Sequence, residues 1–189
     1  MTKTKNITMN PKFFAKFVDV VSDNSQCHSD ILNFEEAVFA ELSLKNAVLY
    51  MADQHSNIYS GEWKVAHCTR SDFCFYYLET QNPVEATNIK LNTVEEIDEP
   101  SYYLDGKVFG LLVSLYAYIF LYYAHIQRKN KSAAILHSTD GHTVKRRFAT
   151  LAKGFFEEPN LHDINDNEAN EIKAMLDFIE TYTKEDYEA

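Results

Sequence analysis

The sequence predicts an α+β domain in which a small antiparallel sheet of about three to four strands packs against several helices, including a buried central helix. Two observations predict this fold. Aromatic residues alternate with other residues on both sides of a short polar turn, and one long stretch of the chain carries no charge. With 189 residues, of which 46% are hydrophobic, and only 5 Gly and 4 Pro, the chain is large and apolar enough to form one core.

A β-hairpin is predicted between residues 62 and 78. The polar residues 69–72 form its turn, and a period of two with many aromatic side chains is typical of paired, half-buried strands. The alternating residues are Trp63, Val65 and His67 before the turn and Phe73, Phe75 and Tyr77 after it. A third short strand is expected at Ile89, Leu91 and Thr93, after a turn at Asn82-Pro83.

The central helix is predicted over residues 107–127. Asp105 is a good N-cap, and the basic Arg128, Lys129 and Lys131 suit the negative end of the helix dipole. The uncharged run Val108–Ala124 approaches the length of a membrane span, but it carries four tyrosines along its middle and end. We therefore expect a helix buried inside the protein.

The other predicted elements are helical. A short helix is expected over residues 11–21, with Asn10 as its cap and Pro11 at its first position. Residues 31–58 are mostly helical with a break near Ser43, and further helices cover residues 139–154 and 166–183. Asp140-Gly141 is interpreted as a turn. We expect residues 1–30 to be a partly loose N-terminal extension and residues 31–189 to be one domain.

The charge balance limits the possible partners. The formal net charge of −10 disfavours direct binding to nucleic acid or to an anionic membrane, both of which require clustered Lys and Arg. The run Lys145–Arg147 is a basic cluster, but three residues are few for nucleic-acid binding, so we expect a surface patch or pairing with acidic loops. An acidic surface could dock on a basic protein patch, or could simply keep the protein soluble.

The three cysteines form no paired motif. Cys27, Cys68 and Cys74 fit reduced thiols in a cytoplasmic protein, and the N-terminal residues lack the apolar stretch of a signal peptide. A disulfide between Cys68 and Cys74 across the hairpin turn is the alternative.

Signals for catalysis are weak throughout the sequence. The seven histidines lack the spacing of metal ligands, and the sequence has no nucleophile motif, phosphate-binding loop or dinucleotide fingerprint. Paired acids such as Glu157-Glu158 are interpreted as solvated. We therefore expect no enzyme activity, no metal and no cofactor.

Two stretches of the sequence, and a shorter third one, resemble the ArdB/KlcA family of antirestriction proteins. Tyr59–Trp63 and Phe73–Tyr76 are similar to that family's "Tyr-x-Gly-Gly-x-Trp…Gly-Phe-Tyr" hairpin, although Glu62 replaces its second glycine. Residues 105–118 resemble its "Asp-Ala-Ala-Gly-Ile…Leu-Tyr-Ala" helix, and Ile172–Asp177 its closing "Ile-x-Ala-x-Ile-Asp". Order and approximate spacing agree over about residues 44–180.

The resemblance implies a non-enzymatic protein, carried by a plasmid or phage, that relieves type I restriction of incoming DNA by binding a protein partner, for which the restriction-modification machinery is the candidate. The matching positions are Tyr59, Gly61, Trp63, Phe75, Tyr76, Asp105, Gly110, Tyr116 and Asp177. Most of them suit a structural role, whereas Asp177 is a candidate contact with the partner. The acidic loop residues Glu95, Glu96 and Asp98 are further candidates for that contact.

Two other classes of function remain open at this stage. One is a non-catalytic structural or interaction domain of another role. The other is a small-molecule binder with an aromatic pocket under the tyrosine-rich helix.

Overall fold

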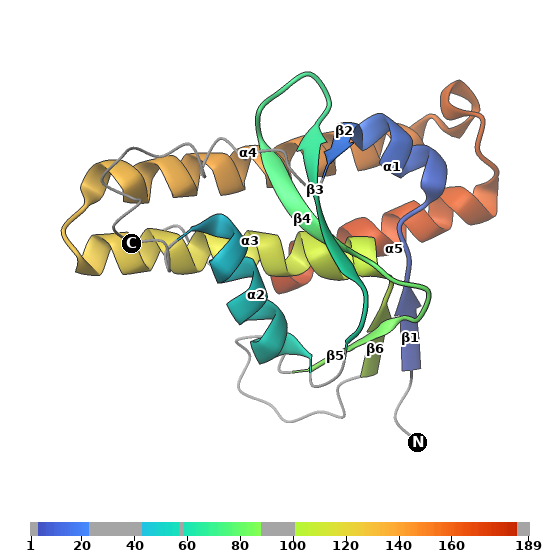
Figure 1. The fold of residues 1–189 in the computed structure, drawn as a ribbon. Coiled ribbons are helices and arrows are strands. Elements are labelled where there is room, and N and C mark those ends of the chain that lie inside the picture. Colours follow the sequence, from blue (N-terminus) through green and yellow to red (C-terminus); the bar gives the residue numbers. More distant parts are fainter. Residues whose placement is uncertain (1–3, 23–42, 57–58, 88–100, 185–189) are drawn as a thin grey trace.

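The computed structural model describes residues 4–22, 43–56, 59–87 and 101–184. It confirms the α+β fold, with helices around two small sheets of three strands each. One sheet has the order β2-β3-β4 and the other the order β1-β6-β5 (Figure 1). The strands are β1 (Thr4–Ile7), β2 (Val18–Ser22), β3 (Glu62–Cys68), β4 (Cys74–Glu79), β5 (Val84–Ala86) and β6 (Ser101–Leu104).

The helices follow the capping signals of the sequence. Asn10, Ser43 and Asp105 cap α1, α2 and α3 with their side-chain oxygens, and the pair Asn165 and Glu168 forms a capping box on α5. The helices are α1 (Pro11–Phe17), α2 (Leu44–His55), α3 (Gly106–Gln127), α4 (Lys131–Glu157) and α5 (Asp166–Tyr182), with the short 3-10 helix η3 (Pro159–His162) between the last two.

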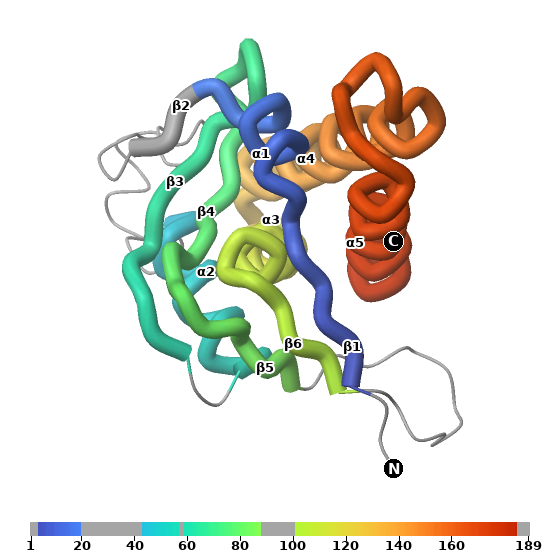
Figure 2. The backbone as a smooth tube through the Cα atoms, turned by 90° about the vertical axis from the view of Figure 1, so that its right-hand side faces the viewer, coloured from blue at the N-terminus to red at the C-terminus, as the bar shows by residue number. Residues whose placement is uncertain are grey.

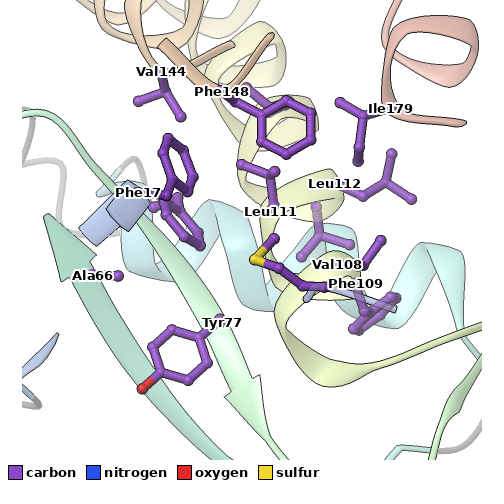
Figure 3. Close-up of a cluster of buried hydrophobic side chains, with 14 of the residues drawn as sticks. Phe17, Ala66, Tyr77, Val108, Phe109, Leu111, Leu112, Val144, Phe148 and Ile179 are labelled. Carbon is purple, nitrogen blue, oxygen red and sulfur yellow. The ribbon is translucent and has the colours of Figure 1, made fainter. Parts of the chain in front are cut away.

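Helix α3 is the buried central helix that the sequence predicts. Figure 2 looks along it and shows the β3–β4 hairpin and α2 on one side of it and α5 on the other. Its Leu111 and Leu112 are fully buried and lie in the cluster that also contains Phe148 of α4 and Ile179 of α5 (Figure 3). Burying apolar surface on all sides of one helix is the main stabilising term of this fold.

Helix α3 also covers an edge of a sheet. The hydroxyl of Ser114 accepts a hydrogen bond from the backbone N–H of Tyr76 at 2.9 Å and donates one to the carbonyl of the same residue at 3.1 Å. The hydroxyl of Tyr118 donates to the carbonyl of Cys74 at 2.8 Å. These side chains satisfy backbone hydrogen-bonding groups at the outer edge of β4, where another strand would otherwise pair. The sheet of β1, β6 and β5 therefore forms separately.

Several sequence predictions need correction. Helix α4 begins at Lys131 rather than at residue 139, because Asn130 caps it through the N–H of Ala133, and Asp140-Gly141 lies inside the helix rather than in a turn. Helix α1 ends at Phe17, and the chain continues as β2. The observed strand after the hairpin is Val84–Ala86, whereas the strand expected at residues 89–93 lies outside the described residues.

The N-terminal residues belong to the folded body. β1 pairs in parallel with β6, and the side chains of Phe13 and Phe17 are buried in the core. Within residues 4–22 the expected loose extension is therefore not observed. The burial of two phenylalanine side chains stabilises by roughly 3 to 6 kcal/mol, which is enough to hold this segment in place.

Candidate interaction site

The matched family positions at the start of β3 form an aromatic corner on α3. The rings of Tyr59 and Trp63 are half-buried and lie with their centroids 5.9 Å and 6.3 Å from that of the buried Phe109. The Tyr59 hydroxyl donates to the carboxylate of Asp53 at 2.8 Å. Burial, together with that hydrogen bond and the negative charge of Asp53, raises the pKa of Tyr59 to about 12, so the phenol stays protonated and remains a donor.

Two glycines allow the elements around this corner to approach closely. Gly61 has φ +144°, and a Cβ atom there would lie 2.4 Å from the carbonyl oxygen of Glu79. A Cβ atom on Gly110 would lie 2.2 Å from the Cα of Tyr77 and 2.5 Å from the carbonyl oxygen of Tyr76. Only glycine fits at these two positions, which explains them as determinants of the fold.

Asp105 ties the N-terminal segment to the start of α3. Its carboxylate accepts from the backbone N–H groups of Lys107 and Val108 and from that of Met9 at 2.6 Å. Burial raises the pKa of Asp105, while those N–H groups and the charge of Lys107 act in the opposite direction. The carboxylate therefore has two structural tasks, which are to cap the helix and to anchor the β1–α1 connection.

The remaining matched aromatic residues also serve the fold. Phe75 is fully buried and stacks on Phe17 at 5.3 Å, and Tyr76 is buried in β4. The Tyr116 hydroxyl donates to the carbonyl of Tyr182 at 2.7 Å, which links α3 to the end of α5. The hydroxyls of Tyr116 and Tyr118 are thus used for contacts between elements of the fold.

The candidate partner contacts are separate from this corner. Asp177 is exposed on α5, and α3 lies between α5 and the hairpin in Figure 2. Glu95, Glu96 and Asp98 lie outside the described residues. The structure therefore brings together the aromatic and glycine positions and leaves Asp177 on a different surface.

The three basic residues Lys145–Arg147 of α4 lie in different surroundings. Lys145 donates from Nζ to the carbonyl of Thr183 at 2.6 Å, at the C-terminal end of α5 where a cation suits the helix dipole. Arg147 donates to the carbonyl of Thr69 at 3.0 Å, at the hairpin turn. Its guanidinium also lies 5.8 Å from the ring centroid of Phe73. Arg146 is exposed.

A buried histidine pair lies between α3 and α4, and the sequence analysis did not identify it. The rings of His125 and His137 stack with centroids 5.2 Å apart, and both side chains are fully buried. Burial, and secondarily the neighbouring His125, lowers the pKa of His137 to about 3. The signal in the sequence that could have revealed this pair is the position of the two histidines, because they lie on either side of the turn that joins the two helices.

The bonding state of the cysteines differs from the sequence prediction. Cys74 is disulfide-bonded, so the expectation of reduced thiols is wrong for this residue. Cys68 is a free, buried thiol, so the alternative of a disulfide between Cys68 and Cys74 is also wrong. Burial raises the pKa of Cys68 to about 12, which makes its thiol a poor nucleophile.

Within the ranges that the structure describes, no group of three or more His, Cys, Asp or Glu side chains is placed to hold a metal ion. In the same ranges, α3 is the one helix long and apolar enough to cross a membrane, and most of its apolar stretch is buried inside the fold, as in the core helix of a soluble protein.

No family model, curated protein or solved structure matches the chain.

Proposed function

We propose that the protein is an antirestriction-like inhibitor that relieves type I restriction of incoming DNA in the cytoplasm by binding a protein partner, for which the restriction-modification machinery is the candidate. The observation that carries the proposal is the junction of α3 with the β3–β4 hairpin. Gly110, in the second stretch that resembles the ArdB/KlcA family, lies against Tyr76 of the first stretch, and Tyr59 and Trp63 of the first stretch pack on Phe109, the chain neighbour of Gly110. A chance resemblance would not require the matching positions of separate stretches to be in contact.

The proposal assigns no catalytic step to the protein. The matched positions act in packing, capping and turn formation, and inhibition by binding requires a stable surface rather than an activated nucleophile or base. The half-buried Tyr59 and Trp63 belong to residue types that are common in the centres of protein interfaces. Asp177 is the charged matched position that solvent, and so a partner, can reach.

The test is a restriction assay in cells. Bacteria with a type I restriction system are infected with unmodified phage, with and without expression of the protein, and plating efficiency is measured. Expression should raise the plating efficiency of unmodified phage and leave that of modified phage unchanged. Unchanged plating of unmodified phage, with the soluble protein detected in the same cells, would refute the proposed function.

A pair of variants tests the contact residue. Asp177→Asn should lower the relief of restriction without changing the melting temperature, because substitution of an exposed side chain changes stability by only about 0.5 kcal/mol. Glu171→Gln is the matched control, since it removes another exposed acid from the same helix. Equal loss of relief in both variants would indicate a general effect of charge and count against a specific role for Asp177.

A further inference from the structure

Charged residues are unevenly distributed along the chain. Over all described residues together, the numbers of basic and acidic side chains are equal. The described residues hold sixteen Lys or Arg side chains and sixteen Asp or Glu side chains, although the whole chain has 18 and 28. Residues 101–153 hold eight of those basic side chains and two acidic ones, Asp105 and Asp140. Residues 154–184 have the opposite balance, with eight acidic and two basic side chains. Within the described ranges, residues 101–153 therefore carry a positive net charge.

The outer face of α4 is a continuous stripe of hydrogen-bond donors. Its exposed residues recur at intervals of three or four, which places them on one side of the helix over about 33 Å. From Lys131 to Lys153, all of them except Ile135 can donate a hydrogen bond, and Glu157, the exposed residue in the last turn of the helix, is acidic. The α4 stripe consists of Lys131, Ser132, Ile135, Thr139, His142, Arg146, Thr150 and Lys153.

The cations of the α4 stripe are not consumed by the packing of the helix. Lys145 and Arg147 hold α5 and the hairpin, whereas Lys131, Arg146 and Lys153 are exposed to solvent. Lys153 lies 3.7 Å from Glu180 of α5, but both side chains of that pair are about half exposed, at 52% and 43%, so solvent weakens their interaction.

We propose that the α4 stripe binds the phosphate backbone of duplex DNA. Phosphates are contacted mainly by Lys, Arg, Ser and Thr side chains, which are the residue types of the stripe. An acidic protein is the less suitable partner, because the centres of protein interfaces are rich in aromatic side chains and Ile135 is the stripe's one exposed apolar residue. Single-stranded DNA is also less suitable, since its bases stack on aromatic side chains and the stripe has none. This inference does not depend on the proposed function.

The test is salt-dependent binding of the full chain to a fluorescein-labelled 30-base-pair duplex, measured by fluorescence anisotropy at pH 7.5. Three phosphate contacts predict a slope of about −2.7 for the logarithm of the binding constant against that of the salt concentration, so affinity should fall about 40-fold between 50 and 200 mM NaCl. The absence of binding at 20 mM NaCl would overturn the proposal.

Two triple variants separate the stripe from overall charge. Replacing Lys131, Arg146 and Lys153 by Gln should abolish most of the binding and bring the slope close to zero. Replacing the exposed Lys16, Lys45 and Lys173 by Gln changes the net charge equally and should preserve the slope. Equal loss in both variants, with circular dichroism showing that both are folded, would mean that no particular face binds DNA and would refute the assignment.

A competition experiment distinguishes the two kinds of anionic partner. Polyglutamate at a charge concentration equal to that of the duplex should displace little labelled DNA, because it lacks the regular phosphate array. If polyglutamate instead displaces the duplex at lower charge concentration than unlabelled duplex does, the stripe is an acidic-protein site and the DNA proposal is wrong.

Discussion

The buried histidine pair makes stability depend on pH. His137 is fully buried, and neither of its ring nitrogens has a hydrogen-bond partner among the residues that the structure describes. Its pKa is about 3 in the folded protein, against an ordinary value of 6.5. The folded state therefore keeps this imidazole neutral at pH values where the unfolded chain protonates it, and acid favours unfolding.

The size of the effect follows from the two pKa values. Stability contributed by the neutral imidazole is fully present above pH 6.5 and is lost as the pH falls toward 3, with a limiting slope of about 1.4 kcal/mol per pH unit. Between pH 8 and pH 5 the loss from His137 is about 2 kcal/mol, a large share of the 5 to 15 kcal/mol that typically stabilises a domain. The measurement is urea unfolding, followed by circular dichroism, at a series of pH values.

Substitution isolates the contribution of His137. His137→Phe keeps a flat ring in the stack and removes the titrating group. Between pH 8 and pH 5, the free energy of unfolding of this variant should therefore decrease less than that of the wild-type protein, and the difference between the two decreases should be about 2 kcal/mol. His67→Gln, on β3, is the control and should retain the wild-type dependence. If wild-type protein and His137→Phe lose the same stability over this range, the reasoning about the buried pair is refuted.

The remaining predictions concern packing and thiol chemistry. Gly110→Ala should destabilise by about 3 kcal/mol in thermal unfolding, because its Cβ would lie 2.2 Å from a Cα atom of β4 and overpacking outweighs the gain in helix propensity of about 1 kcal/mol. Gly154→Ala, with its nearest atom at 3.9 Å, is the control and should keep or raise the melting temperature. Ser114→Ala should cost about 2 to 4 kcal/mol in urea unfolding, because it leaves a buried N–H and a buried carbonyl of β4 without a partner, and an unchanged midpoint would contradict this. In alkylation followed by mass spectrometry, Cys74 should react only after reduction and Cys68 only after unfolding; labelling of Cys74 in unreduced protein extracted under acid quench would show that the disulfide is absent.

Local signals in the sequence predicted the elements that surround α3. The alternation around Trp63 and Phe75 predicted the hairpin, and the position of Asp105 before an uncharged run predicted the central helix and its cap. These predictions succeeded because each depends on residues within about ten positions of one another. The start of α4 was missed because Ser138 and Thr139 are also good N-cap residues, whereas the helix begins at the Asn130 cap.

Long-range pairings could not be predicted in the same way. The parallel pairing of β1 with β6 joins residues 4–7 to residues 101–104, and no local pattern in residues 4–7 specifies it. The aromatic corner shows the same limit at the candidate site. The sequence resemblance identified Tyr59 and Trp63, but the contact of both rings with Phe109 became visible only in the fold.

Net charge proved a poor guide to the surface because it is a sum over the whole chain. Twelve of the 28 acidic residues and only two of the 18 basic ones lie outside the described ranges, so the described body has no net charge. Electrostatic attraction depends on charges within about one Debye length, roughly 8 to 10 Å, of the bound phosphate. Lys131, Arg146 and Lys153 of the α4 stripe act on a partner at that range, and Glu180, 3.7 Å from Lys153, is an acid that acts at the same range. DNA binding by this face stays a prediction, and the salt dependence of DNA binding is the measurement that decides it.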